Sequence, residues 1–364
     1  MTKRKNDLIT VLGARPQFIK AAVVSKELQK IGISECIIHT GQHFDHQMSQ
    51  VFFDELGLSS PSDSLNLSGL SFSEFLVRAV SGVSDTIEKY QPRAVMVYGD
   101  TYSTLAGALA AKKLNKSLIH VEAGLRSGSL TSPEEYNRVV TDSLSDIAYC
   151  PTQSAVQQLG SEGFRGKALF SGDVMLDSAK KALNDYSPHE GQTPYVLATI
   201  HRAETVDNRK LLSAVLDALS SIKMEIHLPL HPRTKARIAS FDLKLGDNIH
   251  VTNPYGYNDM IAHVADARLV VTDSGGLQKE AYFCGTPSLI LRDETEWREL
   301  IELGVSALAG RATDKIIKMI EEELQRPLIE MEKLKNPFGD GKAGQFIAED
   351  LVKFIEHPKQ YADR

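Results

Sequence analysis

Cysteine is scarce in this sequence, and the three cysteines that are present stand far apart, at positions 36, 150 and 284. None of them forms a C-x-x-C pair, which argues against a disulfide framework and against a cysteine-ligated zinc site. No apolar run reaches the length of a membrane span, and the charged start of the chain is not followed by the apolar core of a signal peptide. We therefore expect a soluble protein in a reducing compartment, the cytoplasm.

An excess of positive charge is also missing. The 47 acidic residues outnumber the 41 lysines and arginines and give a formal net charge of −6. This balance argues against a nucleic-acid binder and against a protein held at a membrane by a basic surface. The composition is that of an average globular chain, with 42% hydrophobic and 24% charged residues, and 364 residues are enough for about two domains.

Hydrophobic periodicity predicts alternating strands and helices, the pattern of parallel βαβ units in a doubly wound α/β sheet. The pattern restarts after about residue 175, and Ser187–Thr193 is the best linker candidate. The expected strands are Leu8–Leu12, Cys36–His39, Ala94–Tyr98, Leu118–Val121, Ile147–Cys150, Tyr195–Ile200, Ile226–Leu230, Leu269–Thr272 and Ser288–Leu291. The expected helices are Phe18–Ile31, Phe72–Tyr90, Thr104–Leu114, Glu134–Asp146, Asn208–Ile222, Asp259–Val264, a segment from Gly276 to about Cys284, Asp314–Arg326 and Gly344–His357.

Five polar clusters stand directly after expected strands. A single cluster of this kind would be turn chemistry, in which Gly and Asp form tight turns and helix caps. Five of them at the carboxyl ends of parallel strands favour a ligand site in the cleft between the two halves of the chain. The clusters are Gly13–Gln17, Gly99–Thr101, Glu122–Arg126, His201–Glu204 and Asp273–Gly276.

The Asp273–Gly276 cluster has the composition of a phosphate site. Its glycines let a phosphate approach the backbone, and the following helix presents free N–H groups and the positive end of its dipole. Glu280, one turn further, would accept hydrogen bonds from a ribose, and Arg15 and Arg292 would neutralise a diphosphate. In the alternative interpretation, Ser274 only caps the helix and the glycines permit close packing.

Three carboxylates and one histidine are candidates for proton transfer. If Asp100, Glu122 and Glu134 lie together, the pKa of one of them is raised, which permits acid and base chemistry near neutral pH. His201 would serve as an acid, a base or a phosphate partner. The alternatives are structural: Glu134 stabilises the first turn of a helix that starts at Pro133, and His201 is hydrogen-bonded at a strand end.

Two other patterns do not indicate sites. Residues 339–344 have the G-x-G-x-x-G spacing of a dinucleotide fingerprint but follow no strand. The histidine-rich stretch His39–His46 is not followed by a fourth ligand at a recognised spacing, so we expect no metal. Because P-loop, H-E-x-x-H and G-x-S-x-G motifs are absent, nucleotide hydrolysis by a P-loop, zinc proteolysis and α/β-hydrolase chemistry are disfavoured.

Taken together, the motifs resemble one known family, the non-hydrolysing UDP-N-acetylglucosamine 2-epimerases. The resemblance covers nearly the whole chain, in order, and the set is highly specific although no single string is. The motifs are VLGARPQFIK (Val11–Lys20), TGQH (Thr40–His43), YGDT (Tyr98–Thr101), HVEAGLRS (His120–Ser127), PEEYNR (Pro133–Arg138), HRAE (His201–Glu204), TDSGGLQKE (Thr272–Glu280), RDETEW (Arg292–Trp297) and NPFGDG (Asn336–Gly341).

The resemblance implies a glycosyltransferase-B-like fold and a homodimer. Two Rossmann-like domains, residues 1–178 and 179–342, would hold the active site in their cleft, and a C-terminal helix in 343–364 would pack back on the first domain. The implied reaction inverts C2 of a UDP-2-acetamido sugar. UDP is expelled by cleavage of the C1–O bond, the C2 proton is lost to give a 2-acetamidoglucal, and UDP adds back with reprotonation on the opposite face. This route needs no nicotinamide cofactor and no metal.

The resemblance also implies roles for individual residues. The acid/base carboxylates and the catalytic histidine, which lies near the departing diphosphate, match Asp100, Glu122, Glu134 and His201. The positions that hold UDP match Arg15, Ser274, Gly275, Gly276, Glu280 and Arg292, with Met260 at the uracil contact and Lys20 and Arg138 as polar residues of the same cleft. Candidates for a second, allosteric UDP-GlcNAc site are Gln42, Gln47, Arg202 and His231. Residues 44–46 depart from the pattern of that second site, so activation by substrate stays open.

Other departures bear on the sugar. Ala14, Gln17 and Trp297 stand where many members have other residues, and these variants resemble a branch that includes epimerases of UDP-2,3-diacetamido-2,3-dideoxy-glucuronate, which feed surface polysaccharides. The sugar stays open between this compound and UDP-N-acetylglucosamine. Three alternative functions also stay open: a retaining glycosyltransferase of the same architecture, an enzyme that hydrolyses the sugar nucleotide, and a non-catalytic sugar-nucleotide-binding protein.

Overall fold

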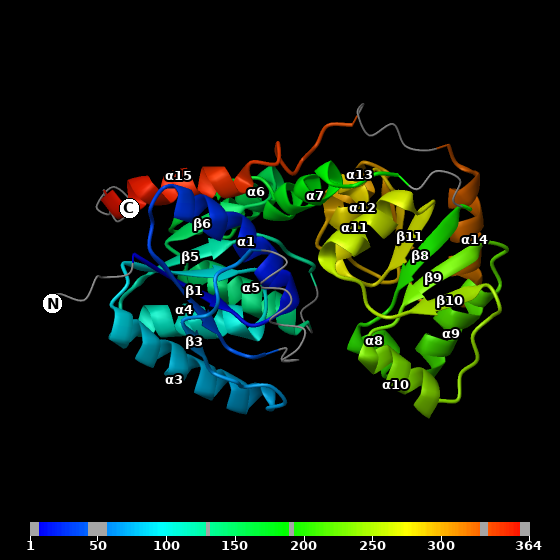
Figure 1. Cartoon of the computed structure of the whole chain (residues 1–364), viewed down its shortest axis with the longest axis horizontal. Helices are drawn as coiled ribbons and strands as arrows, with labels where there is room; N and C mark the ends of the chain where they lie inside the picture. Colours follow the sequence, from blue (N-terminus) through cyan, green and yellow to red (C-terminus); the bar gives the residue numbers. More distant parts are fainter. Residues whose placement is uncertain (1–6, 43–56, 129–131, 189–192, 328–333, 357–364) are drawn as a thin grey trace. The chain divides into compact units, whose positions relative to one another are not determined.

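The chain divides into two compact units, Met1–Ser178 with Asn336–Arg364, and Ala179–Lys335. The computed structural model describes residues 7–42, 57–128, 132–188, 193–327 and 334–356. Each unit is a parallel β-sheet with helices packed on both faces (Figure 1). The division falls within helix α7 (Val174–Asn184). The predicted fold class, two α/β domains with parallel sheets, is confirmed.

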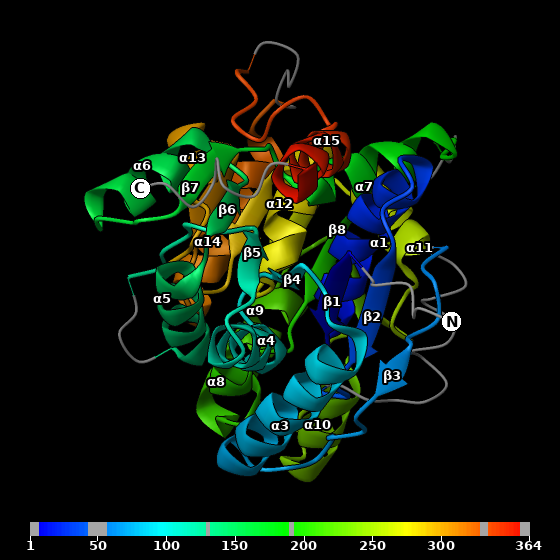
Figure 2. The same ribbon diagram turned by 90° about the vertical axis from the view of Figure 1, so that its left-hand side faces the viewer.

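The first unit contains a seven-stranded sheet with the order β3-β2-β1-β4-β5-β6-β7, and Figure 2 shows these strands side by side. The central strands β1 and β4 align Leu8 with Ala94 and Val11 with Val97, and all their residues are buried. The strands are β1 (Leu8–Leu12), β2 (Glu35–His39), β3 (Asp63–Ser64), β4 (Ala94–Tyr98), β5 (Ser117–Val121), β6 (Ile147–Cys150) and β7 (Lys167–Phe170).

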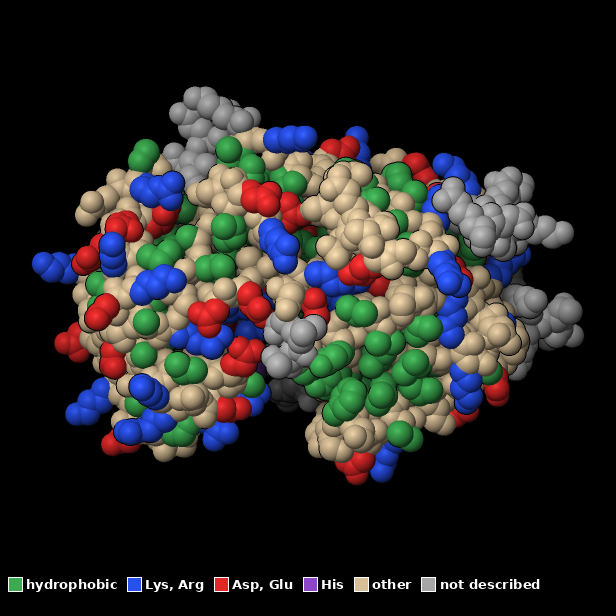
Figure 3. All heavy atoms as spheres, turned by 180° about the vertical axis from the view of Figure 1, so that it is seen from behind, with side chains coloured by type: hydrophobic (Ala, Val, Ile, Leu, Met, Phe, Trp, Pro, Cys, Tyr) green, Lys and Arg blue, Asp and Glu red, His purple; other side chains and the backbone are tan. Residues whose placement is uncertain are grey.

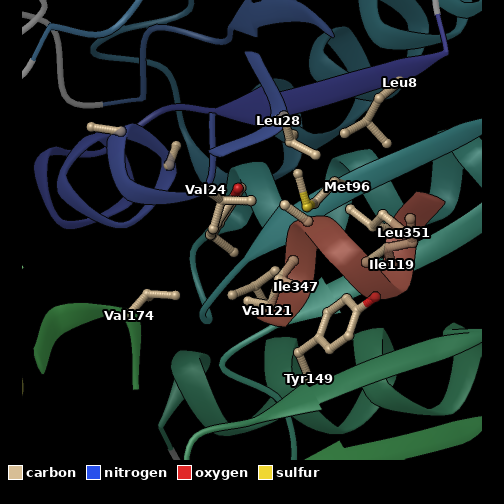
Figure 4. Close-up of a cluster of buried hydrophobic side chains, with 14 of the residues drawn as sticks. Leu8, Val24, Leu28, Met96, Ile119, Val121, Tyr149, Val174, Ile347 and Leu351 are labelled. Atoms are coloured by element: carbon tan, nitrogen blue, oxygen red, sulfur yellow. The ribbon is translucent and has the colours of Figure 1, made fainter. Parts of the chain in front are cut away.

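Helices cover both faces of this sheet. On one face α1 and α15 pack over Leu8, Met96 and Ile119, and Figure 4 shows Ile347 and Leu351 of α15 among these side chains. On the other face α3 and α4 pack over the intervening residues of β1 and β4, because side chains alternate along a strand. The C-terminal helix therefore completes the core of the first unit. The helices are α1 (Arg15–Lys30), α3 (Phe72–Tyr90), α4 (Tyr102–Lys113), α5 (Pro133–Leu144), α6 (Gln153–Ser161), α7 and α15 (Ala343–Glu356).

The second unit contains a six-stranded sheet with the order β10-β9-β8-β11-β12-β13. Helices α9 and α14 pack on one face, and α11 and α12 pack on the other. The strands are β8 (Tyr195–Thr199), β9 (Glu225–Pro229), β10 (Ile249–Thr252), β11 (Leu269–Thr272), β12 (Ser288–Ile290) and β13 (Ser306–Leu308). The helices are α8 (Ala203–Val206), α9 (Arg209–Ser220), α10 (Pro232–Ser240), α11 (Tyr257–Asp266), α12 (Gly275–Phe283), α13 (Arg298–Glu302) and α14 (Thr313–Gln325).

Both sheets reverse their strand order at the centre, between β1 and β4 and between β8 and β11. Loops that leave the carboxyl ends of such a pair run to opposite sides, and α/β proteins bind ligands in the crevice between them. Four of the five predicted polar clusters follow these four strands, and the fifth follows β5, beside β4. Of the helices in the described ranges, none has both the length and the apolar character that crossing a membrane requires.

Candidate functional site

A buried side chain, Gln17, ties together the loops that follow β1 and β4. Its Oε1 accepts hydrogen bonds from the backbone N–H groups of Gly13 (2.8 Å) and Ala14 (3.1 Å). Its Nε2 donates to the carbonyl of Tyr98 (2.9 Å) and to Thr104 Oγ1 (3.0 Å). Because the full hydrogen-bonding capacity of the amide is used, the two loops and the residues next to them have a defined spacing.

Lys20 and Glu122 form a buried ion pair in which Nζ donates to Oε1, and their side chains are only 10% and 8% exposed. Gly99 makes room for this pair: a Cβ at Gly99 would lie 3.2 Å from Lys20 Nζ and 3.4 Å from Glu122 Oε1. Glu122 has a φ of +67°, a conformation that costs a non-glycine residue about 1–2 kcal/mol. The loop therefore holds the carboxylate of Glu122 in a strained backbone conformation.

Asp100 forms the second ion pair of this region, with Arg138 Nη2 donating to its Oδ2. Asn137 Nδ2 donates to the backbone carbonyl of Asp100 at 2.7 Å and fixes its position. Burial raises the pKa of Asp100, the cations Arg138 and Lys20 oppose this, and the two other candidate carboxylates reinforce it. The protonated form of this carboxyl group is therefore favoured relative to that of an exposed aspartate.

Glu134 completes a group that we call the first-unit site: Lys20, Asp100, Glu122, Glu134 and Arg138. Glu134 is half-buried in the first turn of α5, where Ser132 Oγ donates to its Oε2 at 2.6 Å. Its charge acts on Asp100 together with those of Arg138, Lys20 and Glu122. The structure therefore brings together the three predicted carboxylates and two of the predicted cations, Lys20 and Arg138.

His120 supports the loop that leads to Asp100. Its ring is fully buried, with Nε2 2.7 Å from the carbonyl of Gly99 and Nδ1 2.7 Å from Asp142 Oδ1. Asp142 also accepts a hydrogen bond from Arg126 Nη1 at 2.7 Å. Burial disfavours the charged form of Asp142, but hydrogen bonds from His120 and Arg126 and their charges outweigh it and lower the pKa of Asp142. This hydrogen-bond network fixes the position of the Gly99 turn, which leads to Asp100 of the first-unit site.

In the second unit, Asp273 binds the loop after β8 to the end of β11. Its fully buried carboxylate accepts hydrogen bonds from the backbone N–H groups of His201 (3.0 Å) and Arg202 (2.9 Å). Asp273 Oδ1 also lies 3.1 Å from His201 Nδ1, and Arg202 Nε donates to the carbonyl of Asp273 at 3.0 Å. Burial disfavours the charge on Asp273, but His201 and the backbone donors outweigh it, so the pKa of Asp273 is lowered.

The predicted anion site is the N-terminus of α12, and a carboxylate of the protein, Glu296, lies beside its first residue, Gly275. Ser274 is the N-cap, and its Oγ accepts from the N–H of Leu277 at 3.4 Å. Gly275 has no room for a side chain, because a Cβ there would overlap Glu296 Oε1. The buried Arg292 donates through Nη1 to Glu296 Oε2 at 2.9 Å. Arg292 is thus tied to the start of α12 through Glu296.

We call this group the second-unit site: His201, Arg202, Asp273, Ser274, Gly275, Arg292 and Glu296. Gly276 and Glu280 lie further along α12, Gly276 beside open space and Glu280 buried. Met260 of α11 packs against the buried side chains of α12. Arg15, by contrast, is in the first unit, where it is half-buried and begins α1.

The candidates for an allosteric site lie in both units. Gln42 Oε1 accepts from Ser103 N (3.0 Å) and Ser103 Oγ (2.8 Å) at the start of α4. His231 is the N-cap of α10, and its ring centroid is 6.2 Å from that of His201. Gln47 lies outside the described residues. The structure therefore places His231 beside the second-unit site and Gln42 in the first unit.

In the part of the chain that the structure describes, no group of three or more His, Cys, Asp or Glu side chains is arranged to hold a metal ion. His39 is buried with its ring centroid 5.2 Å from that of Phe18, and burial lowers the pKa of His39 to about 4. The remaining histidines of the stretch His39–His46 lie outside the described residues. His39 is thus a core residue of β2.

Comparison with known proteins extends over nearly the whole chain. The family model described as UDP-N-acetylglucosamine 2-epimerase matches residues 26–352. The UDP-2,3-diacetamido-2,3-dideoxy-D-glucuronate 2-epimerase of Pseudomonas aeruginosa is 44% identical over 356 residues, which cover 95% of this chain and 99% of that protein. A crystal structure of the UDP-GlcNAc 2-epimerase of Methanocaldococcus jannaschii, in complex with UDP-GlcNAc and UDP, is 36% identical, with a TM-score of 0.89 and coverage of 95% of this chain and 99% of that one.

A calicheamicin glycosyltransferase matches by fold alone, at 12% identity and a TM-score of 0.55 over 98% of both chains. The two parallel α/β units and these matches define a protein with a glycosyltransferase-B-like fold. The chain belongs to the UDP-N-acetylglucosamine 2-epimerase family. The family, the fold class and the isomerase class predicted from the motifs are confirmed.

The structure also shows supporting residues that the sequence reading missed. Glu135 accepts from the N–H of Ser127 at 3.0 Å and binds that loop to α5. Four of the supporting residues lie inside the motifs quoted above, next to candidate residues, and this position is the signal by which the sequence could have identified them. They are His120, Glu135, Asp273 and Glu296. Asp142 had no such signal, because only the fold brings it to His120, 22 residues away in sequence.

Proposed function

We propose that the chain is a non-hydrolysing 2-epimerase of a UDP-2-acetamido sugar, which inverts C2 by expelling UDP and adding it back. The first-unit site carries this proposal: a buried and a partly buried cation–carboxylate pair lie beside a third carboxylate, and desolvation raises the pKa of Asp100. The C2 proton of the sugar has no adjacent carbonyl to acidify it. A route through loss of UDP therefore needs carboxylates at C2 and an anion-binding site for UDP.

In the proposed first step, the first-unit site removes the C2 proton while the C1–O bond breaks. The electron pair of the C2–H bond forms the C1–C2 double bond of a 2-acetamidoglucal, and UDP leaves with the electrons of the C1–O bond. In the return step UDP adds to C1 and a second acid delivers a proton to the other face of C2. Two faces require two acid/base groups, for which we propose members of the set Asp100, Glu122 and Glu134.

Lys20 and Arg138 keep this set of carboxylates from repelling one another. Each cation pairs with one buried carboxylate, and an opposite charge at this range favours the ionised form. The carboxylates can then differ in their affinity for protons, as a proton donor and a proton acceptor on opposite faces must. We propose that Lys20 and Arg138 act in this way and also contact the substrate.

The second-unit site is proposed to hold UDP. Negative charge grows on the β-phosphate as the C1–O bond breaks, and His201, Arg292 and the N-terminus of α12 would stabilise it. In this proposal both sites act on one substrate molecule. The proposed route contains no redox step and no metal-dependent step. The other residues proposed to contact UDP are Arg15, Ser274, Gly275, Gly276, Glu280 and Met260.

The favoured sugar is the diacetamido-glucuronate form, in a route to surface polysaccharide precursors. The support is the 44% identity to the Pseudomonas aeruginosa enzyme named for that substrate, over 99% of its length. UDP-GlcNAc is the second candidate, because the solved structure from Methanocaldococcus jannaschii contains it. Comparing the rates with the two sugar nucleotides decides between them.

The test is incubation of the purified chain with each sugar nucleotide in deuterated water, followed by NMR of C2. We expect deuterium at C2 and formation of the C2 epimer without any acceptor. Asp100→Asn should abolish both while UDP still binds in a calorimeter. The matched control is Asp350→Asn, a buried carboxylate of α15 that accepts from Tyr149 Oη at 3.0 Å and should leave the rate unchanged.

Other outcomes of this experiment identify the alternatives. Release of free sugar with UDP would indicate a hydrolase, and turnover only with an acceptor would indicate a transferase. Binding of UDP with no exchange at C2 for either sugar would refute the proposal and favour a binding protein. Sigmoidal dependence of the rate on substrate, made hyperbolic by His231→Ala, would support the second site proposed at Gln42, Gln47, Arg202 and His231.

A homodimer is proposed on the basis of an apolar surface on the first unit. Figure 3 shows hydrophobic side chains gathered on one face of this unit, and the exposed large hydrophobic residues include Tyr136, Val139 and Val140 of α5 and Phe72 of α3. Monomers rarely expose large apolar patches, and a second copy of the chain in an isologous contact would cover this one.

Sedimentation velocity tests the dimer. We expect a dimer for the unmodified chain and a monomer when Val139 and Val140 are both replaced by lysine. Val251→Lys is the matched control, because Val251 is an equally exposed hydrophobic residue on β10 of the second unit. A dimer that survives the double substitution would place the interface elsewhere.

We also propose that the protein acts in the cytoplasm. All three cysteines are unpaired thiols, two of them buried, as is usual in a reducing compartment. Cell fractionation of the native host, with the epimerase activity followed in each fraction, tests this location. Activity recovered mainly outside the cytoplasmic fraction would contradict it.

A further inference from the structure

Asp273 is a buried carboxylate that no step of the proposed reaction uses. It is 0% exposed and accepts hydrogen bonds from the backbone N–H groups of His201 and Arg202. The ring of His201 adds a further contact, with Nδ1 3.1 Å from Asp273 Oδ1. A buried acid with several donors stays ionised at neutral pH, so the ring of His201 lies against a negative charge.

This contact determines which nitrogen of His201 is available for chemistry. The nitrogen that faces the carboxylate, Nδ1, carries a proton, which leaves Nε2 with the lone pair in the neutral ring and with an N–H in the imidazolium. The side chain of His201 is 41% exposed whereas that of Asp273 is 0% exposed. With Nδ1 against Asp273, Nε2 is the ring nitrogen left to contact a ligand.

We propose that Asp273 is a positioning residue of the epimerase: it holds His201 in the Nδ1–H form, with Nε2 directed at the departing diphosphate. This inference rests on the proposed function. As the C1–O bond breaks, the electron pair goes to the UDP oxygen, and the imidazolium Nε2–H gives its proton to that oxygen. On re-addition the proton returns to Nε2, and the carboxylate of Asp273 stabilises the imidazolium that forms again.

His231 lies near the same ring, and the side chain of Arg202 is bound to the backbone of Asp273. His231 lies with its ring centroid 6.2 Å from that of His201, and its Nδ1 accepts from the N–H of Arg233 at 3.2 Å. Arg202 Nε donates to the carbonyl of Asp273 at 3.0 Å. Asp273 thus organises both Arg202 and His201, through its carbonyl and its carboxylate.

A purely structural role is the competing explanation, in which Asp273 only anchors the loop through two backbone N–H groups. Asp273→Asn separates the two roles. The amide oxygen of asparagine still accepts from the backbone of His201 and Arg202, but its NH₂ group then faces Nδ1. A ring that meets a donor at Nδ1 takes the other tautomer, with its proton on Nε2.

The decisive kinetic experiment is a double-mutant cycle on C2 exchange. We expect Asp273→Asn to lower kcat by roughly 10²-fold, the usual contribution of general acid–base catalysis, with little change in KM or in UDP binding. In a His201→Gln chain the same substitution should have almost no further effect, because its action passes through the ring. The control Asp350→Asn also removes a buried charge, and it should leave kcat unchanged both in the unmodified chain and in the His201→Gln chain.

Nitrogen-15 NMR of the histidine rings supplies a readout that a structural role would not move. The ring of His201, assigned by its absence in His201→Gln, should be protonated at Nδ1 in the unmodified chain and at Nε2 in Asp273→Asn. A ring protonated at Nε2 in the unmodified chain overturns the inference, and this measurement needs no variant at position 273. Equal losses of rate from Asp273→Asn with and without His201 also overturn it.

Failure of the two proposals can be told apart. If the unmodified chain exchanges no deuterium at C2 with either sugar nucleotide, the proposed function fails, and the tautomer measurement still decides whether Asp273 orients His201. If exchange occurs and Asp273→Asn leaves kcat unchanged, the epimerase stands and the inference about Asp273 fails.

Discussion

Replacing Gly99 with alanine tests whether the Lys20–Glu122 pair is held in place by the turn beside it. Gly99 has a φ of +61°, and an added Cβ would lie 3.2 Å from Lys20 Nζ and 3.4 Å from Glu122 Oε1. The left-handed conformation costs alanine about 1–2 kcal/mol relative to glycine. The contact with the buried pair adds to this, because at such distances the neighbouring atoms must shift by a few tenths of an ångström.

Gly32→Ala is the matched control in the same unit. Gly32 has a φ of +78°, and a Cβ there would meet nothing within 4 Å. The control therefore carries the backbone cost alone, about 1–2 kcal/mol, and should leave the rate of C2 exchange unchanged. Gly99→Ala should show the same backbone cost, a further loss of roughly 1 kcal/mol, and a rate at least about tenfold lower, because misplaced catalytic groups lose rate steeply.

Hydrogen exchange of the backbone amides of β1 and β4 measures the opening free energy of the first unit directly. Deuterium incorporation at C2 measures the rate. If the two variants lose the same stability and Gly99→Ala keeps its full rate, the pair is not held against Gly99, and the proposed role of this turn is wrong.

Two further predictions concern buried charges. Lys20→Met should destabilise the first unit by about 3–5 kcal/mol, since it leaves the carboxylate of Glu122 buried without its cation. The double variant Lys20→Met/Glu122→Gln should regain most of that stability and remain inactive. If urea unfolds the double variant more easily than Lys20→Met, this prediction is wrong. Burial raises the pKa of Asp177 from 3.8 to about 6, so the folded chain binds this proton more tightly than the unfolded chain does. Stability should therefore fall as pH rises from about 4 to about 6, by at most roughly 3 kcal/mol, and Asp177→Asn should flatten this slope in thermal melts; an unchanged slope would assign it to other groups.

The strands in the middle of each sheet were predictable, and those at the edges were not. Ala94–Tyr98 and Leu269–Thr272 agree residue for residue with the expected strands, because a strand buried on both faces is a continuous apolar run. The four strands missed from the sequence are the four edge strands, β3, β7, β10 and β13. Each is short and partly exposed, so its sequence has neither a continuous apolar run nor a clear alternation.

The positions of the helices were predicted less accurately than those of the central strands. The first helix begins at Arg15 and not at Phe18, because Pro16 fits the first turn, where the missing N–H is not needed. Helices α6, α7, α8, α10 and α13 were not expected. For α10 the reason is visible: Thr234 is its buried residue, so the segment Pro232–Ser240 has almost no apolar stripe to detect.

The reactive groups of the two sites could be named from the sequence, but which residues form ion pairs or hydrogen bonds with one another could not. A carboxylate or a histidine after a strand is a local signal, and the strand order then brings such residues to one edge of a sheet. The pairing of Asp100 with Arg138, or of His120 with Asp142, depends on how α5 packs beside β4 and β5. That packing is tertiary, and nothing in the spacing of these four residues specifies it.

The charges of the two sites explain why a weakly acidic chain is compatible with the proposed anionic ligand. In the first-unit site the three carboxylates outnumber the two cations, so a dianionic diphosphate would be repelled there, whereas a proton is readily held. In the second-unit site Arg292 donates to the carboxylate of Glu296, and the backbone N–H of Arg202 donates to the carboxylate of Asp273, so both carboxylates are already satisfied by donors of the protein. Under the proposed function, attraction of UDP would therefore depend on a few cations held in place by the protein, and an overall charge of −6 places no limit on it.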